Sequence, residues 1–440
     1  MNDVAISPFS TLHLHIEMAG KTSNRSAVTV ARMGEPWKMA AKHTYDAQTN
    51  PEGMISFALA ENQLIIDDVR NYVNSKVTFE KEHFMYGWSV AGGTRFPSLL
   101  ATHLNEYLQP YEPILPEQIK SVGACTALHD MLSWALAEEG DGILVSRPIY
   151  GRFELDFTNR AGVKVVYADT DAENCLDEDV SDKYERAIVE SAASGVPIKA
   201  ILIVNPNNPL GKCYPRNTLI NIMKLCEKHQ IHLISDEIYA CSVFDSGEPD
   251  ATPFTSALSI NPAGIIDPEL LHVEYGFSKD FGLGGMKVGA IVSRNQPILQ
   301  ALNTITRFHN PSGPAIAIAN ALLEDREWCR SHVESMRGKL AAAYRHATSG
   351  LQEMGVSYLG GSNAGFFVWM DLSPYLPKDL DGEQNSEFAL AKTLQAAGVF
   401  VHPKEEHSSK PGWFRFVYTH DAATVTEGLK RMKTALSQLN

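Results

Sequence analysis

The chain has 440 residues, more than one hydrophobic core usually organises, so a large domain and a smaller one are expected. Its 44% hydrophobic and 20% charged residues are typical of a globular protein. The formal net charge of −14 argues against nucleic acid or an anionic membrane as the main partner, because such surfaces concentrate Lys and Arg.

The cysteines and the N-terminal sequence exclude further classes. Six cysteines are scattered without a CxxC pair or zinc-like spacing, so neither a disulfide framework nor a metal site is predicted. The first residues lack the basic start and apolar stretch of a signal peptide, and no run of about 18 apolar residues could span a bilayer. We therefore expect a cytoplasmic protein that acts on a small molecule.

The elements predicted in chain order change character twice. Residues 1 to about 50 are polar and weakly periodic, which indicates an arm packed on another lobe or subunit, or a frayed end. From about 120 to 295, short apolar runs alternate with amphipathic stretches, which is the pattern of a mainly parallel α/β sheet. The strands expected there are 142–146, 163–168, 200–204, 232–235 and 288–293.

Helical patterns accompany these strands. Residues 126–137 place apolar side chains on one helical face, so Thr126 is expected at a helix start. The last part, from about 306 to 440, mixes long helical patterns such as 330–355 with short strands. We find no internal repeat and no low-complexity tract.

Polar residues directly follow several of the predicted strands. In an open α/β sheet, ligands bind outside the carboxyl ends of strands, so these residues are the first candidates for a site. Asn208 follows one strand, Asp236 and Tyr239 follow the next, and Lys279 follows a third. Each alone could be a turn, a cap or a solvated charge. Together, an amide, an acid, a phenol, a lysine and a helix start suit an aldehyde cofactor with a pyridine ring, a phenolic oxygen and a phosphate.

The order of motifs NPxNPLG, SDEIYA, SKDxGLxGxxVG and PGWFR resembles the class I aminotransferases of pyridoxal-phosphate (PLP) fold type I. Within them, the chain is most similar to 1-aminocyclopropane-1-carboxylate (ACC) synthases, and the resemblance runs from about Ala58 to Arg431. It implies a large, mainly parallel α/β/α domain, a smaller α+β domain and a homodimer with shared active sites. The implied division is 1–75 as an N-terminal arm and part of the small domain, 76–305 as the large PLP-binding domain and 306–440 as the C-terminal small domain.

The resemblance also implies roles for the residues that would hold the PLP ring. Lys279 would carry the cofactor as a Schiff base and move the α-proton of the substrate. Asp236 would pair with the pyridine nitrogen, and Asn208 and Tyr239 would bond the phenolic oxygen. Tyr150 would stack on the ring, unless it is a core aromatic.

Further residues match the family's phosphate and substrate sites. Cys125 and Thr126 lie where the family binds phosphate at a helix N-terminus, and Ser278 is another hydroxyl there. Arg415 matches the bidentate clamp for the substrate α-carboxylate, although a surface arginine at a strand edge is the alternative. Glu61 matches a glutamate near the ACC synthase substrate site, and could otherwise be a helix-start acid. Asn363 is a further substrate-site candidate, or a turn residue.

Three positions depart from the family pattern. The arginine expected eight residues after the Schiff-base lysine is Lys287, so a point charge replaces a fork on the phosphate. The serine expected three residues before that lysine is Gly276. The tyrosine with which ACC synthases reach the neighbouring subunit's cofactor is replaced by Val90 in direct alignment, which leaves Tyr86 or Trp88 to fill that role.

The predicted activity is therefore that of a PLP enzyme acting at the α-carbon of an amino acid. One branch is an ACC synthase-like lyase that uses S-adenosylmethionine or a related substrate. The other is an aminotransferase that passes the amino group to a keto acid, or a relative with another amino acid substrate, because family resemblance does not fix the reaction. A non-catalytic PLP-binding protein is the third hypothesis, but such a protein needs no carboxylate clamp.

Overall fold

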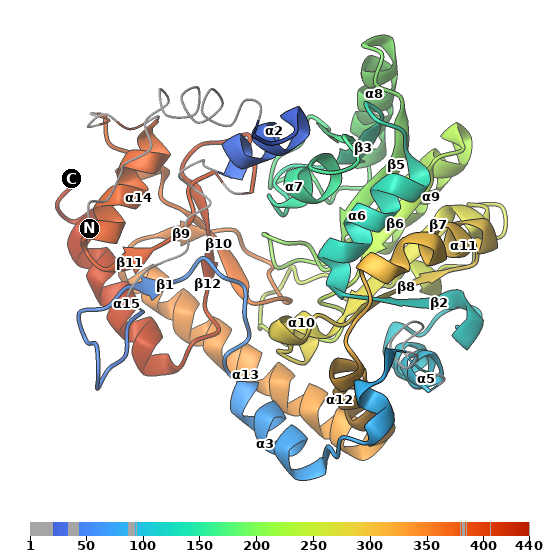
Figure 1. Cartoon of the computed structure of the whole chain (residues 1–440). Coiled ribbons are helices and arrows are strands. Elements are labelled where there is room, and N and C mark those ends of the chain that lie inside the picture. The colour runs from blue at the N-terminus through green and yellow to red at the C-terminus, as the bar shows by residue number, and fades with distance from the viewer. Residues whose placement is uncertain are drawn as a thin grey trace.

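The computed structural model describes residues 21–33, 44–86, 93, 95–378, 380, 383, 385–404 and 406–439. Its largest element is a seven-stranded sheet (Figure 1). In spatial order the strands are β2 (Ile119–Val122), β8 (Gly289–Ser293), β7 (Leu271–Gly276), β6 (His232–Asp236), β5 (Ile198–Val204), β3 (Gly142–Val145) and β4 (Lys164–Tyr167). Strand β8 is antiparallel to both neighbours and all other pairs are parallel, so the predicted mainly parallel architecture is confirmed.

Apolar side chains on both faces of this sheet explain the continuous apolar runs in the sequence, since a buried parallel sheet needs cover on each side. Along β5, Ala200 and Leu202 pack into one core while Ile201 and Ile203 pack into the other. The first core is shared with α6 (Ala124–Leu136), α7 (Phe153–Thr158) and α11 (Gln296–Ile305). The second is shared with α5 (Phe96–Leu108), α8 (Val180–Ala193), α9 (Arg216–His229) and α12 (Gly313–Glu324).

A second, smaller domain has its own core around a three-stranded antiparallel sheet, on the left of Figure 1. The sheet order is β12 (Trp413–Val417), β10 (Phe367–Asp371) and β9 (Ser357–Tyr358). Helices α13 (Arg326–Glu353), α14 (Ser386–Ala396) and α15 (Ala422–Leu436) cover it, and β1 (Ile55–Ser56) pairs in parallel with β11 (Val399–Phe400). Residues from the N-terminal part of the chain therefore belong to this core, as Phe57 does. The domain boundaries after residues 75 and 305 stay predictions.

The remaining α-helices of the described residues are α2 (Asn24–Met33), α3 (Ile66–Lys76) and α10 (Phe277–Asp280), and short 3-10 helices occur between several elements. The predicted arm is only partly covered, because residues 1–20 and 34–43 lie outside the described residues, as do Trp88 and Val90. Helix α6 begins at Ala124, so Thr126 lies in its first turn as expected. None of the helices that the structure describes combines the length and the apolar character needed to cross a bilayer.

Candidate active site

Lys279 lies on the one-turn helix α10, directly after β7. Its Nζ donates a hydrogen bond to the carbonyl of Ala60 at 2.7 Å and lies 5.8 Å from the centre of the Tyr239 ring. Burial, and after it the nearby positive charge of Arg415, lower the pKa of Lys279 to about 8. An amine with such a pKa is partly neutral near pH 7, as a lysine nucleophile or base requires.

Asp280 anchors this short helix from the buried side. Its carboxylate accepts hydrogen bonds from the Cys241 N–H at 2.9 Å, the Ser242 hydroxyl at 2.5 Å and the Tyr275 hydroxyl at 3.1 Å. Burial raises the pKa of Asp280 to about 6, although the bonds from Ser242 and Cys241 act in the opposite direction. Because the neighbour of Lys279 is fixed in this way, the position of the lysine is fixed as well.

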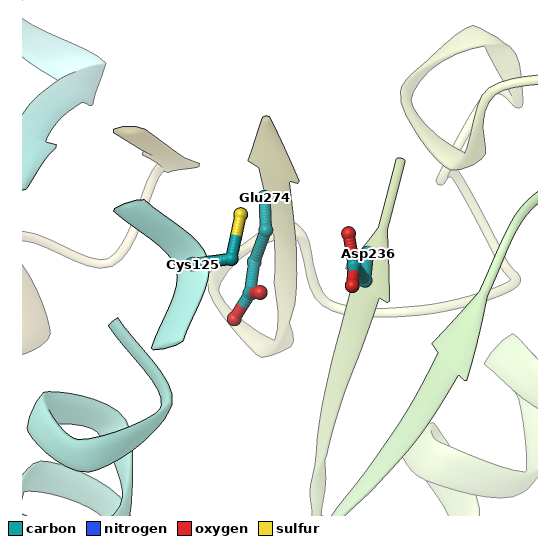
Figure 2. Close-up of side chains that lie close together, drawn as sticks. All are labelled: Cys125, Asp236 and Glu274. Atoms are coloured by element: carbon teal, nitrogen blue, oxygen red, sulfur yellow. The ribbon is translucent and has the colours of Figure 1, made fainter. Parts of the chain in front are cut away.

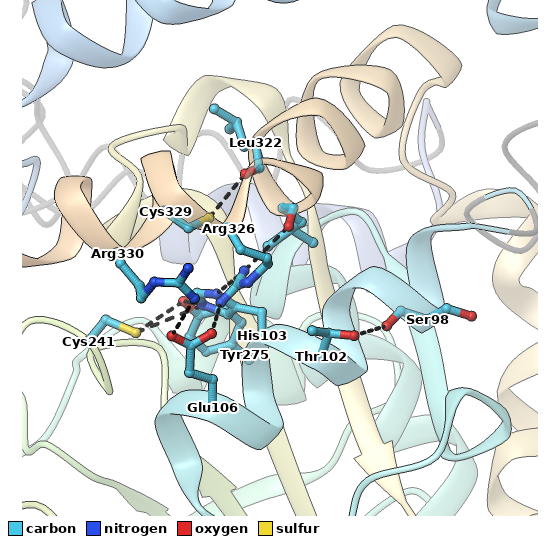
Figure 3. Close-up of polar contacts among 11 residues, drawn as sticks. Ser98, Thr102, His103, Glu106, Cys241, Tyr275, Leu322, Arg326, Cys329 and Arg330 are labelled. Atoms are coloured by element: carbon cyan, nitrogen blue, oxygen red, sulfur yellow. Dashed lines mark hydrogen bonds and ion pairs between the residues drawn. The ribbon is translucent and has the colours of Figure 1, made fainter.

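A directed chain of hydrogen bonds runs from the start of α13 to Asp280, and Figure 3 shows its members Arg326, His103 and Tyr275. Arg326 donates to Nδ1 of His103 at 3.4 Å, so the hydrogen of this imidazole is on Nε2. That nitrogen contacts the Tyr275 oxygen at 3.1 Å, and Tyr275 in turn donates to Asp280. Burial, and after it the positive charge of Arg326, lower the pKa of His103 to about 3, so the ring is neutral. The chain therefore ties α13 and α5 to the lysine helix.

Asp236 is the last residue of β6 and is only 6% exposed. Among the described residues, its carboxylate accepts a hydrogen bond only from the Ile238 N–H, at 3.1 Å. Burial and the nearby carboxylate of Glu274 raise the pKa of Asp236 to about 7. A buried acid with so few donors favours a cationic or protonated partner.

Glu274 lies beside Asp236 because the two residues are register partners on the parallel strands β7 and β6. Figure 2 shows them with Cys125, the second residue of α6. One ligand atom of each of these three side chains lies within 4.8 Å of the others. Among the described residues, these three therefore form a group that could hold a metal ion. The thiol is a poor ligand as it stands, because burial and the Asp236 charge raise the pKa of Cys125 well above its usual range.

Glu274 is also bonded to a buried histidine that sequence reasoning did not select. His129 on α6 contacts Glu274 Oε2 through Nε2 and Asp156 Oδ2 through Nδ1, both at 2.9 Å. Burial alone would lower the pKa of His129, but the two carboxylates raise it well above its usual range. Since both ring nitrogens face carboxylate oxygens, His129 is an imidazolium that donates to each of them.

Arg415 lies on β12 of the small domain and is 5% exposed. Its Nη1 donates to Asn208 Oδ1 and its Nη2 donates to the Ala58 carbonyl, each at 2.8 Å. Glu406, a buried acid absent from the sequence prediction, lies 3.2 Å from Arg415 Nε. The guanidinium is thus held between the two domains, next to the predicted cofactor residue Asn208.

The remaining residues predicted for the cofactor differ in exposure. Tyr239 is buried against Phe366 and Phe367, and its desolvation raises the pKa of its hydroxyl. Tyr150 is half-buried and its ring packs edge-on against Phe153. Three residues expected around the phosphate are half-buried or exposed, namely Ser278, Thr126 and Lys287.

The residues predicted for the substrate and for the partner subunit also differ. Glu61 is exposed, and its charge is one of those that favour the protonated form of Lys279. Asn363 uses its side-chain amide to bond the Thr252 carbonyl at 2.8 Å, a contact that holds a loop. Tyr86 is 97% exposed, and nothing in a single chain tests its predicted contact with a neighbouring subunit.

These groups fit the predicted cofactor. The buried, donor-poor carboxylate of Asp236 suits a protonated ring nitrogen, and the partly neutral Lys279 suits an aldehyde. The first turn of α6 offers backbone N–H groups to an anion, and Ala124 at its start has a left-handed φ of 74°. At Gly276, where the family has serine, an added Cβ would lie 3.3 Å from the Val288 carbonyl oxygen and 3.5 Å from Cys125 Sγ. The glycine therefore fits a place where Val288 and Cys125 approach the backbone closely.

Comparison with known proteins places these observations in a family. The family model of class I and II aminotransferases matches residues 59–432. The ACC synthase 7 of Arabidopsis thaliana is 30% identical to this chain, over 94% of the chain and 97% of its own length. The human ACC synthase-like protein 1 is 29% identical, over 89% of the chain and 78% of its own length.

A likeness in fold extends to solved structures. The aromatic aminotransferase of Pyrococcus horikoshii OT3 superposes with a TM-score of 0.73 at 20% sequence identity. That superposition covers 88% of this chain and 96% of the other. At such identity the match concerns the fold alone, and it confirms the predicted fold type.

Proposed function

Since this chain belongs to the class I and II aminotransferase family, and is therefore a PLP-dependent enzyme, we propose that it is a lyase of the ACC synthase type. The proposal specifies an amino acid substrate that reacts at its α-carbon. It is supported by the likeness to ACC synthases over nine-tenths of the chain. The substrate to be tested first is S-adenosylmethionine.

One observation carries the proposal at the level of geometry. Lys279 and Arg415 come from different domains, yet each donates to a carbonyl of the same short segment, at Ala60 and Ala58. A base for the α-proton and a clamp for the α-carboxylate must lie within the reach of one small amino acid. Two carbonyls that are two residues apart keep these cations within that reach.

The residues that would hold the cofactor follow from the donor set. When bound, PLP supplies an aldehyde that joins amino groups and a pyridinium ring that withdraws electrons from the α-carbon. Lys279 would bind it covalently, Asp236 would accept the ring N–H, and Asn208 and Tyr239 would bond the phenolic oxygen. Thr126, Ser278, Lys287 and the first turn of α6, with Cys125, would surround the phosphate, while Tyr150 would cover the ring.

Arg415 would bind the substrate α-carboxylate, and its own orientation is set by Asn208, Glu406 and the Ala58 carbonyl. Lys279 Nζ would be free to remove the α-proton once the substrate amino group has taken its place on the aldehyde, helped by a pKa that burial lowers to about 8. Glu61 and Asn363 are proposed as further substrate contacts. For Asn363 this requires the amide to exchange its bond to Thr252.

An aminotransferase is the second candidate, and the match to the aminotransferase family model supports it. The two reactions share proton removal by Lys279 and separate afterwards. A lyase releases its leaving group without any acceptor, whereas an aminotransferase needs a keto acid in every cycle. The Lys287 and Gly276 departures bear on the phosphate site and leave both reactions open.

Product analysis of the purified enzyme distinguishes these candidates. With S-adenosylmethionine alone, a lyase must release methylthioadenosine over many turnovers. Turnover that strictly requires a keto acid, with no methylthioadenosine formed, would contradict the lyase and establish the aminotransferase. Absence of turnover both with S-adenosylmethionine and with common amino acids plus a keto acid, with PLP bound, would favour the non-catalytic hypothesis.

Covalent trapping tests the cofactor site itself. Borohydride reduction followed by peptide mapping should place the reduced cofactor on Lys279, and Lys279→Ala should abolish the label. Lys287→Ala is the matched control, because it removes an exposed lysine of the same loop and should weaken cofactor retention while keeping the label on Lys279. A label on another lysine would refute the assignment.

We further propose a cytoplasmic homodimer in which the two subunits share their active sites. The exposed Tyr86 would then contact the cofactor site of the partner. Mixing the inactive Lys279→Ala chain with a Tyr86→Ala chain should restore activity in hybrid dimers if the sites are shared.

A further inference from the structure

The buried cluster of acids beneath the proposed ring-nitrogen site holds more carboxylates than cations. Asp156, Glu274 and Asp236 come from α7, β7 and β6, and their exposure does not exceed 8%. The His129 imidazolium lies between the first two of them. His129 is the cation bonded to two of these three acids, and Lys279 acts on Asp236 through its charge alone, so a further positive charge beside Asp236 is favoured.

Glu274 is the acid that connects the histidine with Asp236. Its Oε2 contacts His129, while its Oε1 is buried without a hydrogen-bond partner among the described residues. Its backbone is paired in register with Asp236, so both side chains lie on the same face of the sheet. An unsatisfied buried carboxylate oxygen beside a second carboxylate is costly unless a proton or a cation serves both.

The titratable groups that face Asp236 come from several elements. They are Glu274 on β7, His129 and Cys125 on α6, Lys279 on α10 and Tyr239 after β6. The Cys125 thiol is neutral, and Lys279 donates its hydrogen bond to the Ala60 carbonyl and not to Asp236. A metal ion is disfavoured because the third ligand of this group, the Cys125 thiol, is protonated and binds metals poorly. The missing charge is therefore best supplied by a proton at the ring nitrogen of the cofactor.

We propose that Glu274, oriented by His129 and Asp156, is a positioning residue that keeps a proton between Asp236 and the cofactor's ring nitrogen. This inference rests on the proposed function, since it presumes PLP at Asp236. Glu274 acts through its negative charge and touches neither the substrate nor the reacting carbon. The His129 imidazolium holds Oε2 of Glu274, which leaves Oε1 as the oxygen without a protein donor beside Asp236.

The test reads the ring nitrogen directly, with PLP labelled with ¹⁵N at that position. In the holoenzyme, the nitrogen resonance should report a protonated ring across the whole pH range in which the protein is folded. In Glu274→Gln, the midpoint of ring deprotonation should fall by about one to three pH units, as expected for the loss of a charge at this distance. Asp236→Asn should lower it at least as far.

Glu237→Gln is the matched control. Glu237 is also fully buried and follows Asp236 directly, but its carboxylate bonds Ser235 and the Ala257 N–H. Its charge also acts on Asp236, but Glu274 is the larger charge acting on that carboxylate, so Glu237→Gln should shift the midpoint of ring deprotonation much less than Glu274→Gln does. Asp156→Asn, which only loosens His129, should shift the midpoint less than Glu274→Gln does, and it serves as the second variant if the latter folds poorly.

A binding measurement gives an independent readout. The ratio of affinities for PLP and for a carbocyclic analogue, in which C–H replaces the ring nitrogen, should fall about tenfold in Glu274→Gln. If Asp236→Asn changes the resonance and the ratio but Glu274→Gln changes neither, the inference is wrong and the proposed function stands. If neither variant has an effect, Asp236 does not contact the ring and the proposed site is wrong.

Discussion

Two buried carboxylates lie near Lys279, and they differ greatly in the number of hydrogen bonds that they accept. Asp280 accepts hydrogen bonds from three donors of the protein, Cys241, Ser242 and Tyr275. Asp236 accepts only one within the described residues, from Ile238, and it lies beside a second acid, Glu274. Asp280 therefore finds its hydrogen-bond donors within the folded chain, whereas Asp236 has room for a further donor. The difference separates a residue that supports the site from one that is kept for a ligand.

The largest expected effect comes from making Asp236 neutral. Asp236→Asn should reduce the turnover of the holoenzyme by about a hundredfold or more, because a charge aimed at the cofactor is lost. The stability of the apoprotein should stay unchanged or rise, since the new amide can donate to the unpartnered oxygen of Glu274. Activity assays and urea unfolding of the apoprotein measure the two effects, and a strongly destabilised apoprotein would contradict the comparison.

The opposite outcome is expected at Asp280. Asp280→Ala leaves three buried donors without an acceptor and should lower the free energy of unfolding by about 3 kcal/mol or more. Asp280→Asn keeps one oxygen acceptor and should lie between wild type and alanine. Urea unfolding checks this prediction, and a loss below about 1 kcal/mol in the alanine variant would show that Asp280 is not the support.

The pH dependence of stability should also distinguish Asp236. Its pKa is raised to about 7 in the folded chain from an ordinary value of 3.8, so the folded apoprotein binds this proton more tightly than the unfolded one. That contribution is complete below about pH 4 and is lost as the pH rises through about 7. Relative to Asp236→Asn, wild-type apoprotein should therefore become less stable between pH 4 and 7. Glu185, whose pKa is lowered by Lys228, is the control, since Glu185→Gln should show the opposite trend.

The smallest effect concerns the chain of hydrogen bonds behind Asp280. Arg326→Ala removes the donor to His103 and the ion pair with Glu106, and should cost about 1 kcal/mol of stability. Arg330→Ala is the matched control, because Arg330 contacts the same Glu106 at 3.5 Å from an exposed position. It should cost less than about 0.5 kcal/mol. Equal losses would show that the bond to His103 contributes nothing.

The sequence predicts the fold well where local pattern decides it. Apolar runs predict the strands of the large sheet except β2, because both faces of a parallel sheet are buried, whereas β2 contains Lys120 and Ser121. The antiparallel direction of β8 could not be predicted, since 288–293 has the same apolar pattern in either direction. The start of α6 was predicted within two residues from its helical periodicity.

Within the site, the sequence identifies residues that follow strands and misses those that act across strands. Glu274 was read as part of a strand, and its proximity to Asp236 depends on the register between β7 and β6. His129 lies among the apolar residues of α6, and its two carboxylate partners come from elsewhere in the fold. The available signal is an acid inside β7, a strand that the fold buries throughout. The ion pair of Arg415 with Glu406 likewise depends on how a loop returns to β12.

The segment from Ala58 to Ala60 is a spacer of fixed length, a ruler, between a side chain of the large domain and one of the small domain. Its carbonyls accept from Arg415 on one side and from Lys279 on the other. Two residues of chain extend over at most about 7 Å, so the separation of the two cations has an upper limit that does not depend on the angle between the domains. Inserting a single residue there would lengthen the ruler by about 3.5 Å, roughly the size of the α-amino acid group that both cations are proposed to grip.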